Sequence, residues 1–434
     1  MDRDVMGELL AWKTSEYRKP LLLEGPRQVG KTWLLRELGS THYEETALVD
    51  FEQTPRLRTI FDADLDPERI LSQLRIATNT AILPGRTLVI LDEIQNCPRA
   101  LTALKYFNEQ ANDYHIACAG SLLGVALHEE ESFPVGKVNF IRVGPLSFSE
   151  FLRAIGEERL LDALTAHHWD WLSPFHDHLV GLLRDYFFVG GMPAVVTRFL
   201  QSRDYAGARS AQEEILQAYE RDFSKHAPAE QVPKIRAVWQ SIPGQLAKEQ
   251  RRFLYSDLAS GARARTHQTA IDWLSQAGVI LPVRRVLAPR LPLSGYVDPD
   301  AFKLYLADIG LLGALASVSP RTVLEPNRLF TEFRGSLTEQ YAAMTLTAAF
   351  ARTPHYWTNA GGTAEVDFVV QRDQDVVPVE VKATLNLKSQ SLRVYREKFS
   401  PALSVRTSLH PYAHQPGLVD LPLYALGELP HIEA

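Results

Sequence analysis

The chain has 434 residues, 45% of them hydrophobic and 23% charged, and its formal net charge is −6. The length indicates two to four domains, and the composition is that of a folded protein rather than a disordered or strongly basic one. The only cysteines, Cys97 and Cys118, lie too far apart in the sequence to indicate a disulfide scaffold or a zinc site. Residues 1–18 lack the apolar core of a signal peptide and no stretch is long enough to span a membrane, so we expect a cytoplasmic protein.

Over the first 145 residues, short apolar runs alternate with helical segments. This pattern is typical of βαβ units built around a parallel sheet. The expected strands are residues 21–24, 48–51, 87–91, 115–119 and 138–143. We therefore predict an α/β domain at residues 1–145.

A glycine-rich motif follows the first expected strand and opens an amphipathic helix at residues 31–38. It fits GxxxxGK[ST] and consists of Gly25, Pro26, Arg27, Gln28, Val29, Gly30, Lys31 and Thr32. The glycines let backbone N–H groups turn toward phosphate, where the helix N-terminus adds positive potential. Lys31 would neutralise the β- and γ-phosphates, and the Thr32 hydroxyl would ligate Mg²⁺. The motif predicts a site for ATP and magnesium.

The apolar strand at residues 87–91 delivers two acids, Asp92 and Glu93, to the edge of the sheet where ligands bind. Asp92 would hold Mg²⁺ through water, and Glu93 would orient or deprotonate the attacking water. Ser121, after the next strand, is a candidate sensor of the γ-phosphate, with a plain helix cap as the alternative. Arg27 and Arg142 are candidates for stabilising transition-state charge, or else ordinary surface arginines.

The middle of the chain has helical periodicity, interrupted by a turn at residues 190–193. Residues 229–300 show helical segments followed by two apolar runs, the order found in a winged helix. Between residues 230 and 290, ten cations stand against four anions, a local net charge of +6 in a chain of net charge −6. This region is a candidate DNA contact, with residues 266–276 as the recognition helix. An interdomain or protein-binding surface is the alternative.

Near the C-terminus, two alternating segments at residues 364–370 and 378–383 flank a charged turn and predict a hairpin. Alternation places Glu380 and Lys382 on one face, where Asp367 would join Glu380 in holding Mg²⁺. Lys382 would steer or activate water, and the metal would polarise a phosphodiester. Glu339, on an expected helix upstream, is a candidate third carboxylate. The order resembles the PD-(D/E)xK nuclease core. A surface charge ladder and a nuclease-like fold without cleavage are the alternatives.

Taken in order, these motifs resemble a family of bacterial and archaeal AAA-type ATPases with a C-terminal domain of unknown function that has a restriction-endonuclease-like fold. The matching stretches are residues 22–32, 88–94, 142–151, 190–193, 303–312, 335–340, 365–368 and 378–383. The resemblance implies an α/β multidomain chain: an AAA core at 1–145, a helical lid at 146–228, a winged helix at 229–300 and a nuclease-like domain at 301–434. Ser121 departs from it, because leucines follow where serine-rich runs are usual.

Three functional hypotheses follow. The first is an ATPase, requiring ATP and Mg²⁺, that controls a metal-dependent nuclease acting on DNA. The second is an ATP-switched module in which an inactive nuclease-like tail binds protein or nucleic acid. The third is a ring-forming motor that threads a substrate, a homo-oligomer for which no aromatic pore loop can be assigned from the sequence.

Overall fold

The computed structural model describes residues 1–120, 134, 136–248, 252–258, 262–325, 328–331, 335–383 and 389–433. The chain forms two compact units. The first comprises Asp2–Gly144 with Gln276–Gly278, and the second contains Pro145–Ser275 and Val279–Ala434. The predicted ATPase core spans residues 1–145, and the first unit also includes Gln276–Gly278.

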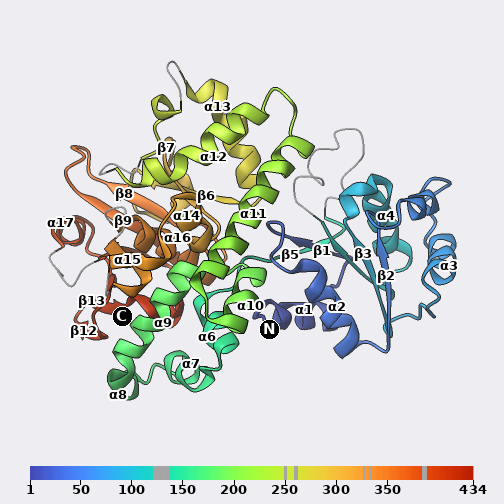
Figure 1. The fold of residues 1–434 in the computed structure, drawn as a ribbon, viewed down its shortest axis with the longest axis horizontal. Helices are drawn as coiled ribbons and strands as arrows, with labels where there is room; N and C mark the ends of the chain where they lie inside the picture. Colours follow the sequence, from blue (N-terminus) through green and yellow to red (C-terminus); the bar gives the residue numbers. More distant parts are fainter. Residues whose placement is uncertain are drawn as a thin grey trace. The chain divides into compact units, whose positions relative to one another are not determined.

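The first unit is built on a five-stranded sheet with the order β2-β3-β4-β1-β5, and every pair is parallel (Figure 1). All five predicted strands are present. The elements are α1 (Val5–Thr14), β1 (Leu21–Glu24), α2 (Lys31–His42), β2 (Glu45–Asp50), η1 (Pro55–Phe61), α3 (Pro67–Thr78), β3 (Thr87–Asp92), η2 (Ile94–Asn96), α4 (Pro98–Gln110), β4 (His115–Ala119) and β5 (Asn139–Arg142). Strands β3 and β4 are wholly buried, because helices cover a parallel sheet on both faces.

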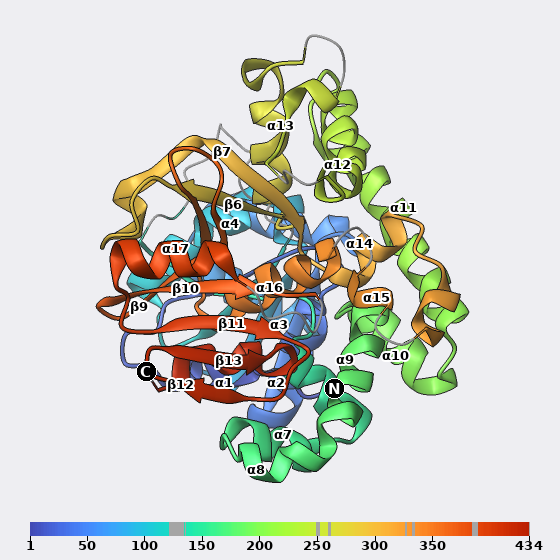
Figure 2. The ribbon, with the colours of Figure 1, turned by 90° about the vertical axis from the view of Figure 1, so that its left-hand side faces the viewer.

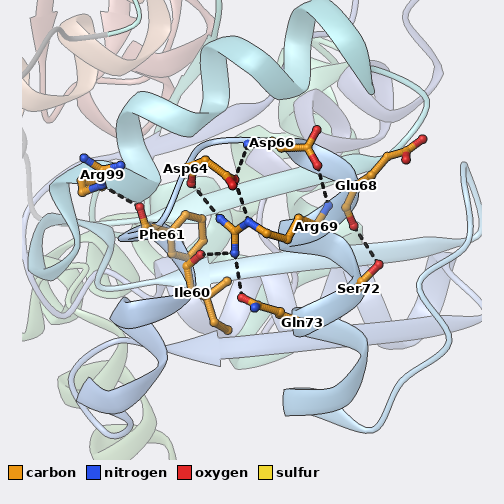
Figure 3. Close-up of polar contacts among 9 residues, drawn as sticks. All are labelled: Ile60, Phe61, Asp64, Asp66, Glu68, Arg69, Ser72, Gln73 and Arg99. Carbon is orange, nitrogen blue, oxygen red and sulfur yellow. Dashed lines mark hydrogen bonds and ion pairs between the residues drawn. The ribbon is translucent and has the colours of Figure 1, made fainter.

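A polar cluster secures the segment between β2 and α3. Asp66 caps α3 by accepting the Arg69 backbone N–H at 3.0 Å. The Arg69 guanidinium donates to Asp64 Oδ1 at 2.6 Å and to the Ile60 carbonyl oxygen at 3.0 Å (Figure 3). One side chain thus ties η1, the connecting loop and the first turn of α3 together.

The second unit begins with helices, as the periodicity predicts. These are α6 (Phe148–Ile155), α7 (Glu158–Thr165), α8 (Trp169–Leu172), η3 (Ser173–Phe175), α9 (His176–Val189), α10 (Pro193–Ser202), α11 (Tyr205–His226), α12 (Val232–Leu246), η4 (Tyr255–Asp257) and α13 (Ala264–Gln276). Further helices follow or interrupt the strands: η5 (Leu293–Tyr296), α14 (Ile309–Leu315), η6 (Pro320–Leu324), α15 (Arg328–Thr331), α16 (Ser336–Ala349), α17 (Gln390–Phe399) and η8 (Leu423–His431).

An eight-stranded mixed sheet organises the rest of this unit (Figure 2). Its order is β12-β13-β11-β10-β9-β8-β6-β7. The strands are β6 (Ile280–Val286), β7 (Val297–Leu306), β8 (His355–Thr358), β9 (Glu365–Arg372), β10 (Asp375–Val381), β11 (Ser404–Ser408), β12 (Ala413–Gln415) and β13 (Leu418–Pro422). The predicted hairpin is confirmed as β9 and β10, which pair antiparallel.

The two apolar runs expected to complete a winged helix form part of a larger sheet instead of a separate two-stranded wing. Strands β6 and β7 pair antiparallel, but β6 also pairs with β8, so the hairpin forms one edge of the eight-stranded sheet. Strand β7 also crosses residue 300, where a domain boundary was predicted. Locally the sequence of a wing and that of an edge hairpin look alike, and only the long-range pairing with β8 distinguishes them.

The two faces of this sheet differ in polarity. Helix α17 covers an apolar face, where Tyr395 meets Trp357 edge-on with ring centroids 5.2 Å apart. Because side chains alternate along a strand, the neighbours of Trp357 and Val366 point to the other face. Helix α16 lies on that face, where Tyr305 of β7 donates a hydrogen bond to Glu339.

The turn at Gly190-Gly191 is held by a buried aspartate. Asp308 caps α14, accepting the Leu311 N–H at 2.9 Å and the Gly191 N–H at 2.6 Å. A Cβ on Gly191 would lie 2.1 Å from the Leu146 carbonyl oxygen, and one on Gly190 would lie 2.4 Å from Asp308 Oδ1. Two of the motifs in the family resemblance, 190–193 and 303–312, therefore meet in one packed junction that only glycines fit. Within the described residues, no helix is both long enough and apolar enough to cross a membrane.

Candidate functional site

The glycine-rich loop joins β1 to α2 in the conformation that its sequence requires. Gly25 has φ +144° and Gly30, the N-cap of α2, has φ +91°. A Cβ on Gly25 would lie 1.9 Å from the backbone oxygen of Val143, on the neighbouring chain segment after β5. Gln28, inside the loop, has φ +66°. The loop is thus a tight turn with two glycines and Gln28 at positive φ, and the glycines allow the close approach that a phosphate cradle needs.

Lys31 points back over this loop. Its Nζ donates to the carbonyl oxygens of Gly25 at 2.9 Å and Pro26 at 2.7 Å. Burial lowers the pKa of the Lys31 ammonium to about 8, and the nearby carboxylate of Glu93 opposes that shift. The hydrogen bonds of the ammonium go to two neutral carbonyl oxygens, an arrangement that an anionic ligand in the loop would improve.

The end of the glycine-rich loop and the acids at the end of β3 meet at the carboxyl edge of the sheet. Thr32 Oγ1 donates to Asp92 Oδ1 at 3.0 Å. The contact arises because only β4 separates β1 from β3 in the sheet, and all three strands run in the same direction. Burial raises the pKa of Asp92, and the Thr32 hydroxyl lowers it. A hydroxyl and a carboxylate in contact form the oxygen ligand set that Mg²⁺ takes in P-loop sites.

Glu93 follows Asp92 in a left-handed backbone conformation, with φ +49°. Its Oε2 accepts a hydrogen bond from Nε2 of Gln95, a side chain that is only 6% exposed. Gln95 was not predicted, since nothing in the motif marks a residue after the two acids. The bond fixes the orientation of the Glu93 carboxylate.

Two further predictions concern the rim of this site. Arg142 is exposed and lies beside Glu24 in the register of β5 and β1. Burial raises the pKa of Glu24, and the charge of Arg142 partly opposes that shift. Ser121, the candidate γ-phosphate sensor, lies outside the described residues.

The C-terminal hairpin brings together the residues predicted from strand alternation. Lys382 Nζ lies 2.7 Å from Glu380 Oε1, and Asp367 Oδ2 accepts the Val381 N–H at 2.8 Å. Burial and the like charge of Asp367 raise the pKa of Glu380 to about 7. Its second oxygen, Oε2, is buried without a hydrogen-bond partner of acceptable geometry among the described residues, as is the neighbouring hydroxyl of Ser389.

Glu339, the predicted third carboxylate, contacts residues of β7. Its Oε2 accepts the Tyr305 hydroxyl at 3.1 Å and lies 3.7 Å from Lys303 Nζ. Lys303 Nζ is also 2.6 Å from Glu365 Oε1. Among the described residues, no three His, Cys, Asp or Glu side chains are grouped so that they could hold a metal ion. The sequence reasoning missed Lys303, Tyr305 and Glu365, because their chain separation from Glu339 or from each other conceals the contacts.

The basic region is only partly available to a ligand. Lys248 pairs with Asp257 at 2.7 Å, and Arg285 forms an ion pair with Asp298. Arg263 and Arg265, at the start of α13, are exposed. Part of the positive charge counted in the sequence is thus paired with carboxylates of the same chain.

Comparisons with known proteins divide the chain into three matched stretches. Residues 180–322 match a domain of unknown function (DUF8612), and residues 334–426 match another (DUF4143). Uncharacterised proteins of Mycobacterium bovis and Mycobacterium tuberculosis are each 26% identical over 379 residues, which is 85% of this chain and 71% of each relative. A Walker-type ATPase of Pyrococcus abyssi is a similar solved structure, with 14% identity, TM-score 0.43 and coverage of 72% of this chain and 95% of that one. The Aeropyrum pernix Orc1 protein, solved in complex with DNA, has 15% identity, TM-score 0.28 and coverage of 72% and 90%.

The remaining match coincides with the site described above. Residues 17–152 match the AAA domain model, and this range contains the glycine-rich loop and the acids at the end of β3. The N-terminal part of this chain is therefore an AAA-type P-loop ATPase domain.

Proposed function

We propose that the chain hydrolyses ATP with Mg²⁺ at the P-loop and that its C-terminal carboxylate cluster is a metal-dependent centre that cleaves DNA phosphodiesters. The observation that carries the first half is the contact between Thr32 and Asp92, with Lys31 lying over the adjoining loop. This is the arrangement of a nucleotide site in which the phosphate-binding and metal-binding groups are already assembled.

Each residue of the P-loop site has a defined task in this proposal. Lys31 would exchange its two carbonyl partners for the β- and γ-phosphate oxygens, a charge-assisted contact that also relieves its burial. Thr32 and Asp92 would hold the Mg²⁺, which neutralises charge on the phosphates when bound. Glu93, oriented by Gln95, would position the attacking water and accept its proton.

Three variants test the ATPase half. We expect Lys31→Met to weaken Mg·ATP binding about 10-fold or more, because the only buried cation of the loop is removed. Glu93→Gln is expected to bind ATP normally and to lose at least about 100-fold in turnover. Lys105→Met, at an exposed lysine on α4 of the same unit, is the control and should match wild type. Binding is measured by titration calorimetry and turnover by phosphate release. Normal turnover by Glu93→Gln would remove that residue from the mechanism.

For the second half, support comes from the buried Glu380 carboxylate, whose Oε2 has no well-aligned hydrogen bond among the described residues, although Ser389 lies close enough to lower the pKa of Glu380. A carboxylate oxygen that is buried and unpaired costs free energy unless a cation or hydrogen-bond donor meets it. Asp367 lies close enough to raise the pKa of Glu380, so the two carboxylates are near neighbours, which a shared metal ion would require. Lys382, in contact with Glu380, would orient the attacking water. A divalent cation bound there would polarise the phosphodiester.

The test for cleavage uses plasmid and linear DNA with Mg²⁺ or Mn²⁺, in the presence and absence of ATP. Asp367→Asn and Glu380→Gln are expected to abolish nicking. Glu397→Gln, at a 70% exposed side chain on α17, should leave nicking unchanged. Cleavage that persists in both cluster variants would mean that it occurs elsewhere in the chain or in a contaminant.

The absence of a three-carboxylate group among the described residues favours a second candidate function. In that alternative the nuclease-like tail is inactive, and the ATPase domain switches a surface that binds nucleic acid or protein. The exposed pair Arg263, just before α13, and Arg265, in its first turn, would then contact DNA phosphates. DNA that is retained in a gel-shift assay but never cut, with affinity lost in Arg263→Ala/Arg265→Ala, would favour this candidate over the nuclease.

A further inference from the structure

Arg3 makes a buried contact with the glycine-rich loop, within the first unit of the fold. Its side chain is only 8% exposed, which is rare for an arginine. Nη1 donates to the carbonyl oxygen of Val29, inside the loop, at 3.0 Å, and Nη2 donates to the carbonyl oxygen of Gly144 at 2.7 Å. These partners lie 26 and 141 residues away in the sequence. One guanidinium therefore joins the segment before α1, the loop and the segment after β5.

The contact with Val29 fixes the direction of the next backbone N–H. The peptide bond between Val29 and Gly30 is trans, and the carbonyl and the N–H of a planar trans peptide point in opposite directions. Because the Val29 carbonyl accepts from Arg3, the N–H of Gly30 points away from Arg3. Gly30 is the N-cap of α2, and the first N–H groups of a helix have no partner within the helix. Arg3 thus orients a free N–H at the helix terminus where the motif predicts phosphate.

The second contact gives Arg3 an anchor outside the loop. Gly144 follows Val143, whose carbonyl oxygen would lie 1.9 Å from a Cβ on Gly25. The segment after β5 therefore touches the first glycine of the loop directly and reaches the other end of the loop through Arg3. A carbonyl oxygen that accepts from a cation is held more strongly than one that meets a neutral donor, so an arginine suits this position.

We infer that Arg3 is a positioning residue for phosphate binding, which aims the Gly30 N–H at the phosphates of ADP or ATP and acts through the backbone of the loop. This inference rests on the nucleotide site of the proposed function, and it adds a residue that lies outside the GxxxxGK[ST] motif. It concerns the binding of the nucleotide and makes no use of the hydrolysis step.

Mg·ADP binding by the full-length protein tests the inference, with titration calorimetry as the measurement. In Arg3→Met we expect the Kd to rise about 10-fold, because one hydrogen bond to phosphate is no longer aligned. Arg3→Lys should lie between wild type and Arg3→Met, since an ammonium can donate to the Val29 carbonyl but lacks the fixed fork that holds two carbonyls. The control is Arg86→Met, which removes a 59% exposed side chain just before β3, at the opposite edge of the sheet. It should bind Mg·ADP as wild type does.

A spectroscopic measurement separates positioning of the loop from general damage to the fold. Labelling with ¹³C in the valine carbonyl and ¹⁵N in glycine selects the amides of glycines that follow valine, which are Gly30, Gly136, Gly144, Gly181 and Gly190. At saturating Mg·ADP, the Gly30 amide proton should shift downfield in wild type and in Arg86→Met, and much less in Arg3→Met. Circular dichroism and thermal unfolding show whether each variant is folded, and the Gly181 and Gly190 signals serve as internal references.

The possible results distinguish this inference from the proposed function. If Arg3→Met keeps the wild-type affinity, or binds more weakly with an unchanged Gly30 shift, the inference is overturned and the nucleotide site stands. Where Arg3→Met does not fold, Arg3→Lys decides alone, and a Kd and a Gly30 shift equal to those of wild type overturn the inference. Failure of the wild-type protein to bind Mg·ADP or Mg·ATP would remove the ATPase half of the proposed function together with the inference.

Discussion

The buried junction at Asp308 yields a quantitative prediction about stability and pH. Burial raises the pKa of this carboxyl from 3.8 to about 6, even though the N–H groups of Gly191 and Leu311 donate to it. The folded chain therefore takes up a proton at a pH where the unfolded chain does not. The group contributes stability that is fully present below the unfolded-state value of 3.8 and is lost as the pH rises through about 6.

The size of the effect follows from these two values. Between about pH 7.5 and about pH 5, the folded state gains nearly one proton at this site, which corresponds to about 1.4 kcal/mol. Asp308→Asn has no titrating group, so the difference in unfolding free energy between wild type and variant should shift by that amount in favour of wild type as the pH falls. The absolute difference also contains the cost of turning an amide NH₂ toward a backbone N–H.

Urea unfolding of both proteins in the same buffers measures this difference, and the comparison cancels the titration of all other groups. Hydrogen exchange at the Gly191 amide measures local opening of the same junction. It therefore tests the prediction even if urea unfolding has more than two states. A difference that stays constant from pH 7.5 to pH 5 would refute the reasoning, because Asp308 would then have an ordinary pKa in the folded protein.

Three further predictions concern Gly191, Arg69 and Lys31. Gly191→Ala should lower the unfolding free energy by about 2 kcal/mol or more in a thermal or urea assay, because its Cβ would lie 2.1 Å from a carbonyl oxygen. The control is Gly181→Ala, where a Cβ has room, and this variant should be as stable as wild type. Arg69→Ala should lower the urea midpoint of the first unit, since it releases the contacts in Figure 3; an unchanged midpoint would contradict this role. Mg·ATP affinity should fall as the pH rises through about 8, where Lys31 loses its charge; a flat affinity from pH 7 to 9 would exclude the lowered pKa.

The parts of the fold that could be predicted are those set by local pattern. The P-loop, the five strands of the first sheet and the β9–β10 hairpin each depend on periodicity and turn residues within a short window. Strand alternation also predicted that Lys382 would lie beside Glu380, and the two side chains are in contact. Neighbours in the same strand need no knowledge of the tertiary fold.

What could not be predicted depends on contacts between distant segments. Lys303 reaches Glu365 across 62 residues, and Asp308 reaches Gly191 across 117. In the sequence, Lys303 is one charge in an apolar run, and nothing nearby shows that β7 will place it in a carboxylate cluster. Glu339 contacts Tyr305 and lies near Lys303, and its role as a third metal ligand stays a prediction.

Two buried lysines show how charge distinguishes a binding group from a structural one. Lys31 and Lys303 are 9% and 0% exposed, so burial penalises both ammonium groups. The partners of Lys31 are carbonyl oxygens and its pKa falls to about 8, whereas Lys303 has carboxylate partners and its pKa rises. A buried cation whose hydrogen bonds go to neutral groups gains from an arriving anion, and a cation already in contact with carboxylates gains less. On this argument Lys31 is poised for phosphate, and Lys303 is an internal counter-ion whose removal should alter what its carboxylates bind.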